Sequence, residues 1–450
     1  MTKQLRPYQE EAVDRFRGTR SAFFAMEMRL GKTLSSIRWI CGEVSRGLIA
    51  VVAPLPVLIS WKDELEGEGL PYIDFSLFSG EDKERAWSKI ADCKKLRFVL
   101  INYEAIRHKQ SMLLTAAGWV LDESTTVKNP TSTTTKTFLS ACKTFTGPIA
   151  CLSGLPAPQC VSELWCQMAI IKRGKWLGFS NYYSFMNSMA TEIANTKYFS
   201  KQNKAIIKSR FHKDAYVLTR EQAGIQEEWI VAKRKQALAP KVKKLYEDIL
   251  KNWAIPGLDG QDDHEEKYSI VVVGWLRRLC GGFLPDRKLP CWKYKDLKNL
   301  LKGELRNESV VIWCAYNEEL KRIKEEVGIP YMCGDTTRPE RVRLQKAFQS
   351  GRIKVLAVQV ALGKFGIRLD KADVAIYFSN AYSCEKKQQS KDRIVDIEKT
   401  KRNSKALLRI EYITEDTIEE DVLDLLEDQN DASRELLHRT LQRRPRVVNN

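Results

Sequence analysis

The feature that most constrains the fold is a series of short apolar runs, each of which is bounded by turn-forming residues. The runs are too short for ordinary helices, and they are continuous instead of alternating, which is typical of strands buried on both faces of a parallel sheet. In the first third of the chain they span residues 21–26, 48–53, 98–101, 119–121 and 149–152. Helix-like stretches such as 34–44 and 58–66 lie between them, so the pattern predicts a doubly wound α/β domain.

A second series of such runs follows after residue 300, at 310–314, 353–358, 374–378 and 407–413. It predicts a second α/β lobe, and a chain of 450 residues is long enough for two or three domains. Between the two series, the stretch 255–263 is rich in Pro, Gly and Asp, which is typical of an exposed connection. Several arginines in residues 431–450 predict a solvated basic tail.

The charge of the chain favours a polyanionic partner. Lys and Arg total 74 against 57 Asp and Glu, a formal net charge of +17, which suits a nucleic acid, although a basic enzyme of another kind has the same balance. The eleven cysteines include no CxxC pair, which argues against a zinc site and fits a reducing cytoplasm. Because the amino terminus lacks a signal-peptide core and no apolar run approaches roughly 18 residues, we expect a soluble cytoplasmic protein without membrane contact.

Phosphate-binding residues are indicated by FFAMEMRLGKT, which places Gly31, Lys32 and Thr33 between a predicted strand and a predicted helix. In a P-loop, backbone amides at the helix start cradle the phosphates, the Lys reaches the outer phosphates, and the Ser or Thr hydroxyl binds magnesium. Met26 stands where the GxxxxGK[ST] pattern has its first Gly, so the triplet alone is a weak signal.

An acidic pair supplies the second requirement of a nucleotide-hydrolysing site. GWVLDEST places Asp122 and Glu123 at the end of the run 119–121. One carboxylate of such a pair holds magnesium, and the other orients or deprotonates the attacking water. Acidic loops are common after strands, but the order strand, GKT, strand and DE favours a site for ATP.

Further segments, from LRPYQ at residue 5 to QQSKDRI at residue 388, follow the order of a known motif set. EMRLGKT resembles the DMGLGKT phosphate loop, DESTTVKNP resembles DEGHRIKN, LSGLPAPQ resembles LTGTPIQN, and VLAVQVALGKFGIRL and QQSKDRI resemble motifs V and VI. By this resemblance the chain is identified as a member of the Swi/Snf-type ATPases of helicase superfamily two, in a compact form of the kind that prokaryotes and their viruses encode.

The resemblance implies an α/β fold of two RecA-like parallel-sheet lobes in tandem, with a helical extension between them. The implied domains are an ATP-binding lobe over residues 1–225 with the extension at about 160–215, a linker and helical start of the second lobe over 226–300, a C-terminal helicase lobe over 301–430, and the tail 431–450.

Site residues are implied by the same motifs. Catalytic roles fall to Lys32, Asp122, Glu123 and Arg393. Contacts with ATP fall to Arg6, Gln9, Arg29, Leu30, Gly31, Lys32, Thr33, Gly366 and Arg393. Magnesium falls to Thr33 and, partly through water, to Asp122. Contacts with nucleic acid fall to Pro54, Trp61, Tyr103, Gly334 and Gln359.

Two departures from the family pattern concern catalysis and coupling. Asp396 stands where motif VI has its second arginine, which the family supplies to the γ-phosphate. Loss of such an arginine costs on the order of 10³-fold in rate, roughly 4 kcal/mol, unless Arg393 or Arg402 replaces it. DEST also lacks the His of DE-x-H that can bridge the nucleotide site to the LSGLPAPQ loop, although Thr125 retains a hydroxyl.

The resemblance predicts an ATP-dependent DNA translocase or helicase that remodels duplex or branched DNA, without sequence preference, in replication, recombination or repair. A nucleotide-gated DNA-binding scaffold with little hydrolysis stays open because of Asp396, and an RNA helicase is a further alternative. The aromatic stretch 175–186 is expected to pack instead of stacking on bases. Arg277 and Arg278 of WLRRLCGG are expected either on DNA or on a solvated helix face.

Overall fold

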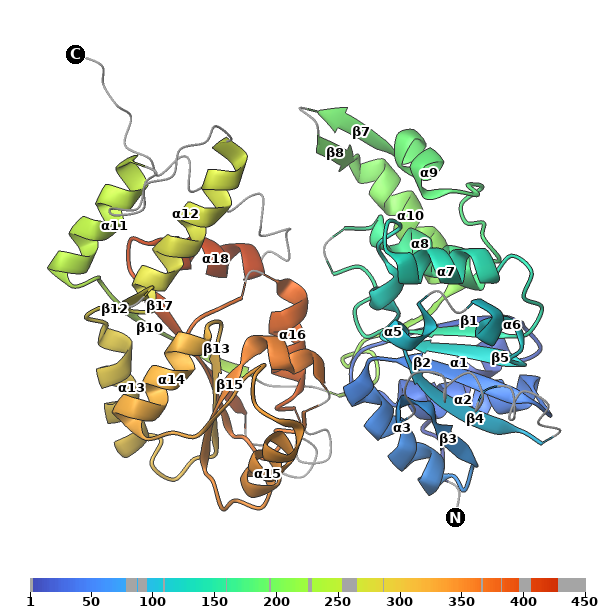
Figure 1. Ribbon diagram of the computed structural model, residues 1–450, viewed down its shortest axis with the longest axis horizontal. Coiled ribbons are helices and arrows are strands. Elements are labelled where there is room, and N and C mark those ends of the chain that lie inside the picture. Colours follow the sequence, from blue (N-terminus) through green and yellow to red (C-terminus); the bar gives the residue numbers. More distant parts are fainter. Residues whose placement is uncertain are drawn as a thin grey trace. The chain divides into compact units, whose positions relative to one another are not determined.

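The computed structural model describes residues 3–77, 87, 95–107, 110–158, 160–193, 196–225, 229–252, 265–285, 287–365, 367–381, 383–395 and 406–427 (Figure 1). The chain forms two compact units, residues 1–226 and 227–450, called here the first and the second lobe. None of the helices in the described ranges combines the length and the apolar character that crossing a membrane requires.

The first lobe is built on a seven-stranded sheet whose neighbouring strands all run parallel, in the order β3-β4-β2-β5-β6-β1-β9. The strands are β1 (Ser21–Met26), β2 (Leu48–Ala53), β3 (Tyr72–Asp74), β4 (Arg97–Asn102), β5 (Gly118–Asp122), β6 (Ile149–Leu152) and β9 (Tyr216–Leu218). The five predicted runs are confirmed as strands, and their central residues are buried on both faces. The pattern does not reveal β3 and β9, which are edge strands of three residues each.

Helices cover both faces of this sheet (Figure 1). One face carries α1 (Pro7–Phe16), α2 (Lys32–Glu43) and α3 (Leu55–Gly67), and the other carries α5 (Tyr103–Ile106), α6 (Gln110–Leu114), α7 (Thr133–Ala141) and α8 (Glu163–Ile171). Successive residues of β1 serve opposite faces: the ring of Phe24 meets Phe16 and Trp39 edge-on, whereas that of Phe23 meets Phe211. The lobe is therefore the three-layered α/β domain that the apolar runs predict.

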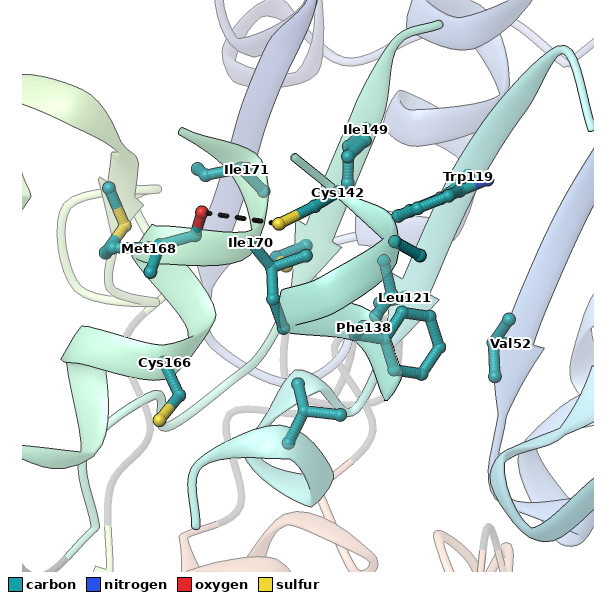
Figure 2. Packing of buried hydrophobic residues seen from close by; sticks show 14 of the residues in the cluster. Val52, Trp119, Leu121, Phe138, Cys142, Ile149, Cys166, Met168, Ile170 and Ile171 are labelled. Atoms are coloured by element: carbon teal, nitrogen blue, oxygen red, sulfur yellow. Dashed lines mark hydrogen bonds between the residues drawn. The ribbon is translucent and has the colours of Figure 1, made fainter. Parts of the chain in front are cut away.

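The core under α7 and α8 combines aliphatic, sulfur-containing and aromatic side chains, some of which Figure 2 shows. Trp119 of β5 stacks on Phe145 with ring centroids 4.0 Å apart and meets Phe138 of α7 edge-on at 6.0 Å. The thiol of Cys142 donates to the carbonyl of Ala169 in α8 at a sulfur–oxygen distance of 3.9 Å. This packing fixes α8 against the sheet, close to the carboxyl ends of β5 and β6.

The extension of the first lobe is formed by α9 (Tyr182–Met189), the antiparallel hairpin β7 (Ala190–Ile193) and β8 (Thr196–Phe199), and α10 (Lys201–Asp214). Trp176 and Phe185 are buried in the same core as Trp119. The prediction that the stretch 175–186 packs is therefore confirmed for these two side chains.

The second lobe contains a six-stranded sheet, also parallel throughout, in the order β10-β17-β16-β13-β15-β14. The strands are β10 (Trp229–Gln236), β13 (Val310–Cys314), β14 (Tyr331–Met332), β15 (Val355–Gln359), β16 (Val374–Tyr377) and β17 (Leu407–Thr414). The four predicted runs are confirmed as β13, β15, β16 and β17. The pattern does not predict β10, which pairs with β17 over its whole length although it lies in the region interpreted as a linker.

Within the described residues, the helices of the second lobe form three groups. One face of the sheet packs against α13 (Trp292–Lys302) and α14 (Asn317–Val327), and the other against α15 (Arg338–Gln349) and α16 (Cys384–Asp392). A separate apolar cluster joins α11 (Pro240–Asn252), α12 (Glu265–Cys280) and α18 (Ile418–Glu427) beside the hairpin β11 (Phe283–Leu284) and β12 (Arg287–Lys288).

Short 3-10 turns occur in both lobes. They are η1 (Phe75–Leu77) and η2 (Ser124–Val127) in the first lobe and η3 (Val360–Phe365) in the second.

Candidate functional site

The loop between β1 and α2 has a backbone that depends on glycine and on a contact with the amino-terminal segment. Gly31 has a φ of 78°, and a Cβ added there would lie 2.0 Å from Nε2 of Gln9. That Nε2 donates to the carbonyls of Leu30 and Gly31, both at 3.3 Å, and Oε1 of Gln9 accepts from the amide of Arg6 at 2.8 Å. These hydrogen bonds from Gln9 therefore stabilise the backbone of the phosphate loop. Arg29 also has a left-handed backbone, with a φ of 68°.

Lys32 begins α2 and carries the positive charge of the loop. Its Nζ donates to the carbonyls of Met26 at 2.8 Å and Glu27 at 3.2 Å, so the side chain folds back along its own loop. The amino end of α2 adds the positive end of a helix dipole to this charge. Together the ammonium and the helix end can bind an anion such as a phosphate.

Asp122 ends β5 and is almost completely buried. Its Oδ2 accepts from the indole Nε1 of Trp61 at 2.8 Å, its Oδ1 accepts from the amide of Glu123 at 2.8 Å, and the hydroxyl of Tyr103 donates to its backbone carbonyl at 2.9 Å. Burial raises the pKa of the Asp122 carboxyl, whereas the bond from Trp61 and the charge of Lys32 lower it. These hydrogen bonds hold the Asp122 carboxyl group in one orientation, and the positive charge of Lys32 acts on it.

Glu123 follows with an unusual backbone, since its φ of 50° and ψ of 53° are left-handed. Non-glycine residues in this conformation are uncommon and cluster at functional sites. The side chains of Thr33 and of the two acidic residues offer oxygen atoms as metal ligands, which is the ligand type that Mg²⁺ prefers.

The loop after β6 lies against the phosphate loop. A Cβ added to Gly154 would be 3.1 Å from Cγ of Met28 and 3.5 Å from Nζ of Lys32, so the two loops are in close contact at this glycine. Ser153 is buried, and its Oγ accepts from the amide of Leu155 at 3.2 Å. The loops after β1, β5 and β6 therefore meet at one edge of the sheet.

In the second lobe, Gly334 and Gln359 lie together at the ends of β14 and β15. The amide of Gly334 donates to Oε1 of Gln359 at 2.9 Å, and Nη2 of Arg341 donates to the carbonyl of Gly334 at 2.5 Å. Gly334 is exposed and Gln359 is half-buried. Both positions are open to a ligand at the surface.

Arg393 caps the carboxyl end of α16, where its Nε donates to the carbonyl of Gly363 at 2.8 Å. The carbonyl of Arg393 accepts from the amide of Leu369 at 3.1 Å. Arg393 thus fastens the motif V segment to the motif VI helix. The predicted contact Gly366 and the positions Asp396 and Arg402 lie outside the described residues.

Two domain matches agree with this arrangement. Residues 8–256 match the SNF2-related domain, and residues 292–398 match the helicase conserved C-terminal domain. The first match covers more than half of the chain. The chain belongs to the SNF2-related family. The expected membership in the Swi/Snf-type group of superfamily two is therefore confirmed.

Relatives of this SNF2-related chain are distant and longer. YwqA of Bacillus subtilis (strain 168) is 22% identical over 96% of this chain and 49% of its own length, and the ISWI chromatin-remodeling complex ATPase ISW1 of Saccharomyces cerevisiae is 23% identical over 94% and 39%. The chain thus spans about half the length of these relatives, or less. The solved Sulfolobus solfataricus SWI2/SNF2 ATPase core in complex with dsDNA is 21% identical, with a TM-score of 0.44 over 98% of this chain and 95% of that one.

Three residues of the SNF2-related chain that were predicted at a nucleic-acid contact or on a solvated face are buried. Trp61 and Tyr103 are predicted to contact nucleic acid; both side chains are buried, and their polar atoms donate to Asp122. The contacts of these two residues with nucleic acid stay predictions. Arg277 is neither solvated nor exposed to a ligand, since it is buried, donates to the carbonyl of Asn380 and lies over the ring of Tyr316 at 5.3 Å.

Sequence reasoning also missed a polar side chain beside the site. Gln167 of α8 is fully buried and bonds both to Ser124, next to the acidic pair, and to Pro156, in the loop after β6. A glutamine within the apolar sequence ELWCQMAII was a visible signal, because buried amides need partners.

Proposed function

We propose that this SNF2-related chain is a DNA-dependent ATPase that translocates along DNA and remodels duplex or branched DNA in replication, recombination or repair. The observation that carries the proposal is the edge of the first sheet, where the buried Asp122 ends β5 and Lys32 begins α2 in the loop after β1. An acidic residue and a lysine so placed on loops at one edge of a parallel sheet suit the binding and hydrolysis of a nucleoside triphosphate.

In this proposal each residue of the first lobe has one task. Lys32 and the amides at the start of α2 bind the phosphates, Gln9 and Arg6 support the loop on the adenine side, and Glu123 orients the attacking water. Thr33 and Asp122 would hold Mg²⁺, which neutralises phosphate charge when it is bound. Leu30 and Arg29 shape the loop.

DNA is the proposed partner because the chain is strongly basic, with a net charge of +17. Such a charge favours contacts with the phosphate backbone, which are independent of sequence and weaken with salt. Pro54, Gly334 and Gln359 are the proposed contact positions. Each of them follows or ends a strand of its sheet and is half-buried or exposed.

One observation favours a different function. Arg393 already donates to Gly363, and Asp396 replaces the second arginine of motif VI in the sequence. If neither Arg393 nor another residue reaches the γ-phosphate, the protein would bind DNA in a nucleotide-gated manner and hydrolyse little ATP. An RNA helicase is the second alternative, and it differs in the nucleic acid that stimulates turnover.

The test is steady-state ATP hydrolysis by the full chain without nucleic acid and with single-stranded, duplex or forked DNA, or RNA. We expect duplex or forked DNA to stimulate turnover strongly and Glu123→Gln to abolish the stimulation. Stimulation by forked over linear DNA would support a role in remodelling branched structures. No turnover above that of Glu123→Gln on any ligand would exclude a motor, and stronger stimulation by RNA would favour the RNA helicase.

A further inference from the structure

A buried glutamine joins two loops of the first lobe. Gln167 lies on α8 between Cys166 and Met168, which Figure 2 labels on that helix. Its Oε1 accepts from Oγ of Ser124 at 2.7 Å. Its Nε2 donates to the carbonyl of Pro156 at 2.7 Å and to a carbonyl one turn earlier in α8 at 2.9 Å. The amide thus has a partner on both its oxygen and its nitrogen.

The two ends of this link lie beside the proposed chemistry. Ser124 directly follows Glu123, the residue assigned to the attacking water. Pro156 belongs to the loop 153–158, in which Gly154 lies against the phosphate loop and close to Nζ of Lys32. Gln167 therefore connects the residue after the acidic pair to the loop that lies beside Lys32.

The sequence explains why the link runs through these residues. DEST replaces the DEGH of the family pattern, so the His expected to bridge the acidic pair to the loop after β6 is missing. Ser124 stands where that pattern has a Gly, which has no side chain to donate a hydrogen bond. Its hydroxyl reaches Gln167, and Gln167 reaches Pro156, so a serine and a glutamine span the same gap.

The surroundings make the link stiff. Ser124 and Gln167 are both fully buried, and neighbouring residues of α8 belong to the apolar core under the sheet. Separating Ser124 from Gln167 would leave Oε1 of Gln167 without this partner in a place that water does not reach, which is unfavourable. A shift of the loop 153–158 is therefore transmitted to Ser124, and a shift of Ser124 to the loop.

We propose that Gln167 is a positioning residue that couples the acidic pair to the loop 153–158, so that stimulation of ATP hydrolysis by DNA requires the link from Ser124 through Gln167 to Pro156. The inference rests on the proposed function, because only a nucleic-acid-dependent ATPase has a stimulation to transmit. Gln167 touches neither nucleotide nor DNA in this scheme, and it acts by holding two loops in register.

The first experiment breaks the link at each arm in the full chain. Ser124→Ala removes the hydroxyl, Gln167→Leu removes the amide, and Ser124→Thr keeps a hydroxyl as the conservative variant. Trp39→Phe is the matched control, because it also loses one buried hydrogen bond, from Nε1 to the carbonyl of Phe16 at 2.9 Å, on the opposite face of the sheet. The readouts are the DNA-stimulated kcat, the DNA concentration for half-maximal stimulation, and the melting temperature.

We expect Ser124→Ala and Gln167→Leu each to lower the DNA-stimulated kcat about 10-fold, with no change in the DNA concentration for half-maximal stimulation. The double variant should be no worse than either single variant, since one link can be broken only once. Ser124→Thr should restore stimulation, and Trp39→Phe should melt earlier but keep it. Normal stimulation in both Ser124→Ala and Gln167→Leu, or losses that multiply in the double variant, would overturn the proposal.

A second measurement separates this inference from the proposed function. Hydrogen exchange with a non-hydrolysable ATP analogue should show protection at residues 27–33 and at 153–158, and Ser124→Ala should lose only the second. This pattern in a protein that DNA does not stimulate would remove the proposed function and leave the link in place. The link would be overturned if the analogue gave no protection at 153–158 in the natural protein, or if Ser124→Ala kept that protection.

Discussion

In the first lobe Asp122 is held by neutral donors, whereas in the second lobe buried ion pairs join α16 to β17 and α13 to α18. The Asp122 carboxylate accepts from the indole of Trp61 and from a backbone amide. In the second lobe, Lys387 of α16 pairs with the fully buried Glu411 at 2.6 Å, and the fully buried Lys293 pairs with Glu419 at 2.6 Å.

This difference has energetic consequences. Loss of one neutral buried hydrogen bond costs about 1–3 kcal/mol, whereas removal of one member of a buried ion pair costs about 3–5 kcal/mol because the other charge is left without compensation. The hydrogen bonds at Asp122 are therefore expected to contribute less to stability than the ion pairs of Lys293 and Lys387 in the second lobe.

The largest expected effect concerns Lys32 of the first lobe, whose positive charge is proposed to bind the phosphates of ATP. Lys32→Ala should lower DNA-stimulated kcat/KM on the order of 10³-fold, about 4 kcal/mol, because the ammonium at the phosphate loop is lost. Steady-state ATP hydrolysis measures it, with Lys136→Ala, an exposed lysine of α7, as the control. Activity of Lys32→Ala within 10-fold of the natural protein would refute the assignment.

The next effect compares the two kinds of support directly. Lys293→Met should lower the opening free energy of the second lobe by about 3–5 kcal/mol, since Glu419 loses its partner. Trp61→Phe should lower that of the first lobe by about 1–3 kcal/mol, since Asp122 loses one donor. Hydrogen exchange on peptides of each lobe in the full chain measures both. Equal losses would show that the ion pair is not the stronger support.

A smaller effect concerns pH. Burial raises the pKa of Glu319 from 4.5 to about 7, although the Ser379 hydroxyl and the charge of Lys293 lower it. Below about pH 4.5 the carboxyl is protonated in both folded and unfolded chains. As the pH rises toward 7 the unfolded chain releases this proton first, so the stability of the second lobe should fall, by about 3 kcal/mol in total.

Glu319→Gln should remove that dependence, because an amide does not titrate. The urea midpoint of the second lobe, followed by pulse proteolysis between pH 5 and pH 8, measures the change. The variant should be the more stable protein at pH 8, and the curve of the first lobe should be the same in both proteins. A parallel pH dependence of the second lobe in the variant and the natural protein would show that another group is responsible.

The smallest expected effect concerns backbone strain in the phosphate loop. Arg29 has a φ of 68° at a position where the family pattern has a Gly. Arg29→Gly should stabilise the first lobe by about 1 kcal/mol, the strain relieved less the added freedom of the unfolded chain. The melting temperature of that lobe measures it. A decrease would show that contacts of the arginine side chain outweigh the strain.

Much of the fold follows from local patterns in the sequence. Runs such as 48–53 and 310–314 are apolar at every position, and only a strand covered on both faces buries every residue of so short a segment. The order of GKT and DE along these strands likewise determined which edge of the first sheet holds Lys32 and Asp122, because the carboxyl ends of parallel strands share one edge.

Other features were decided only by the tertiary structure. The edge strand β10 pairs with β17 although 178 residues separate Trp229 from Leu407, and apolar residues fill only its first half, 229–232, whereas 233–236 are polar. Trp61 and Tyr103 look like surface aromatics in their motifs, but packing turns them inward to Asp122. Whether a side chain meets solvent or a buried carboxylate depends on segments that are distant in the sequence, and for the same reason the link through Gln167 becomes visible only when α8 lies against the sheet.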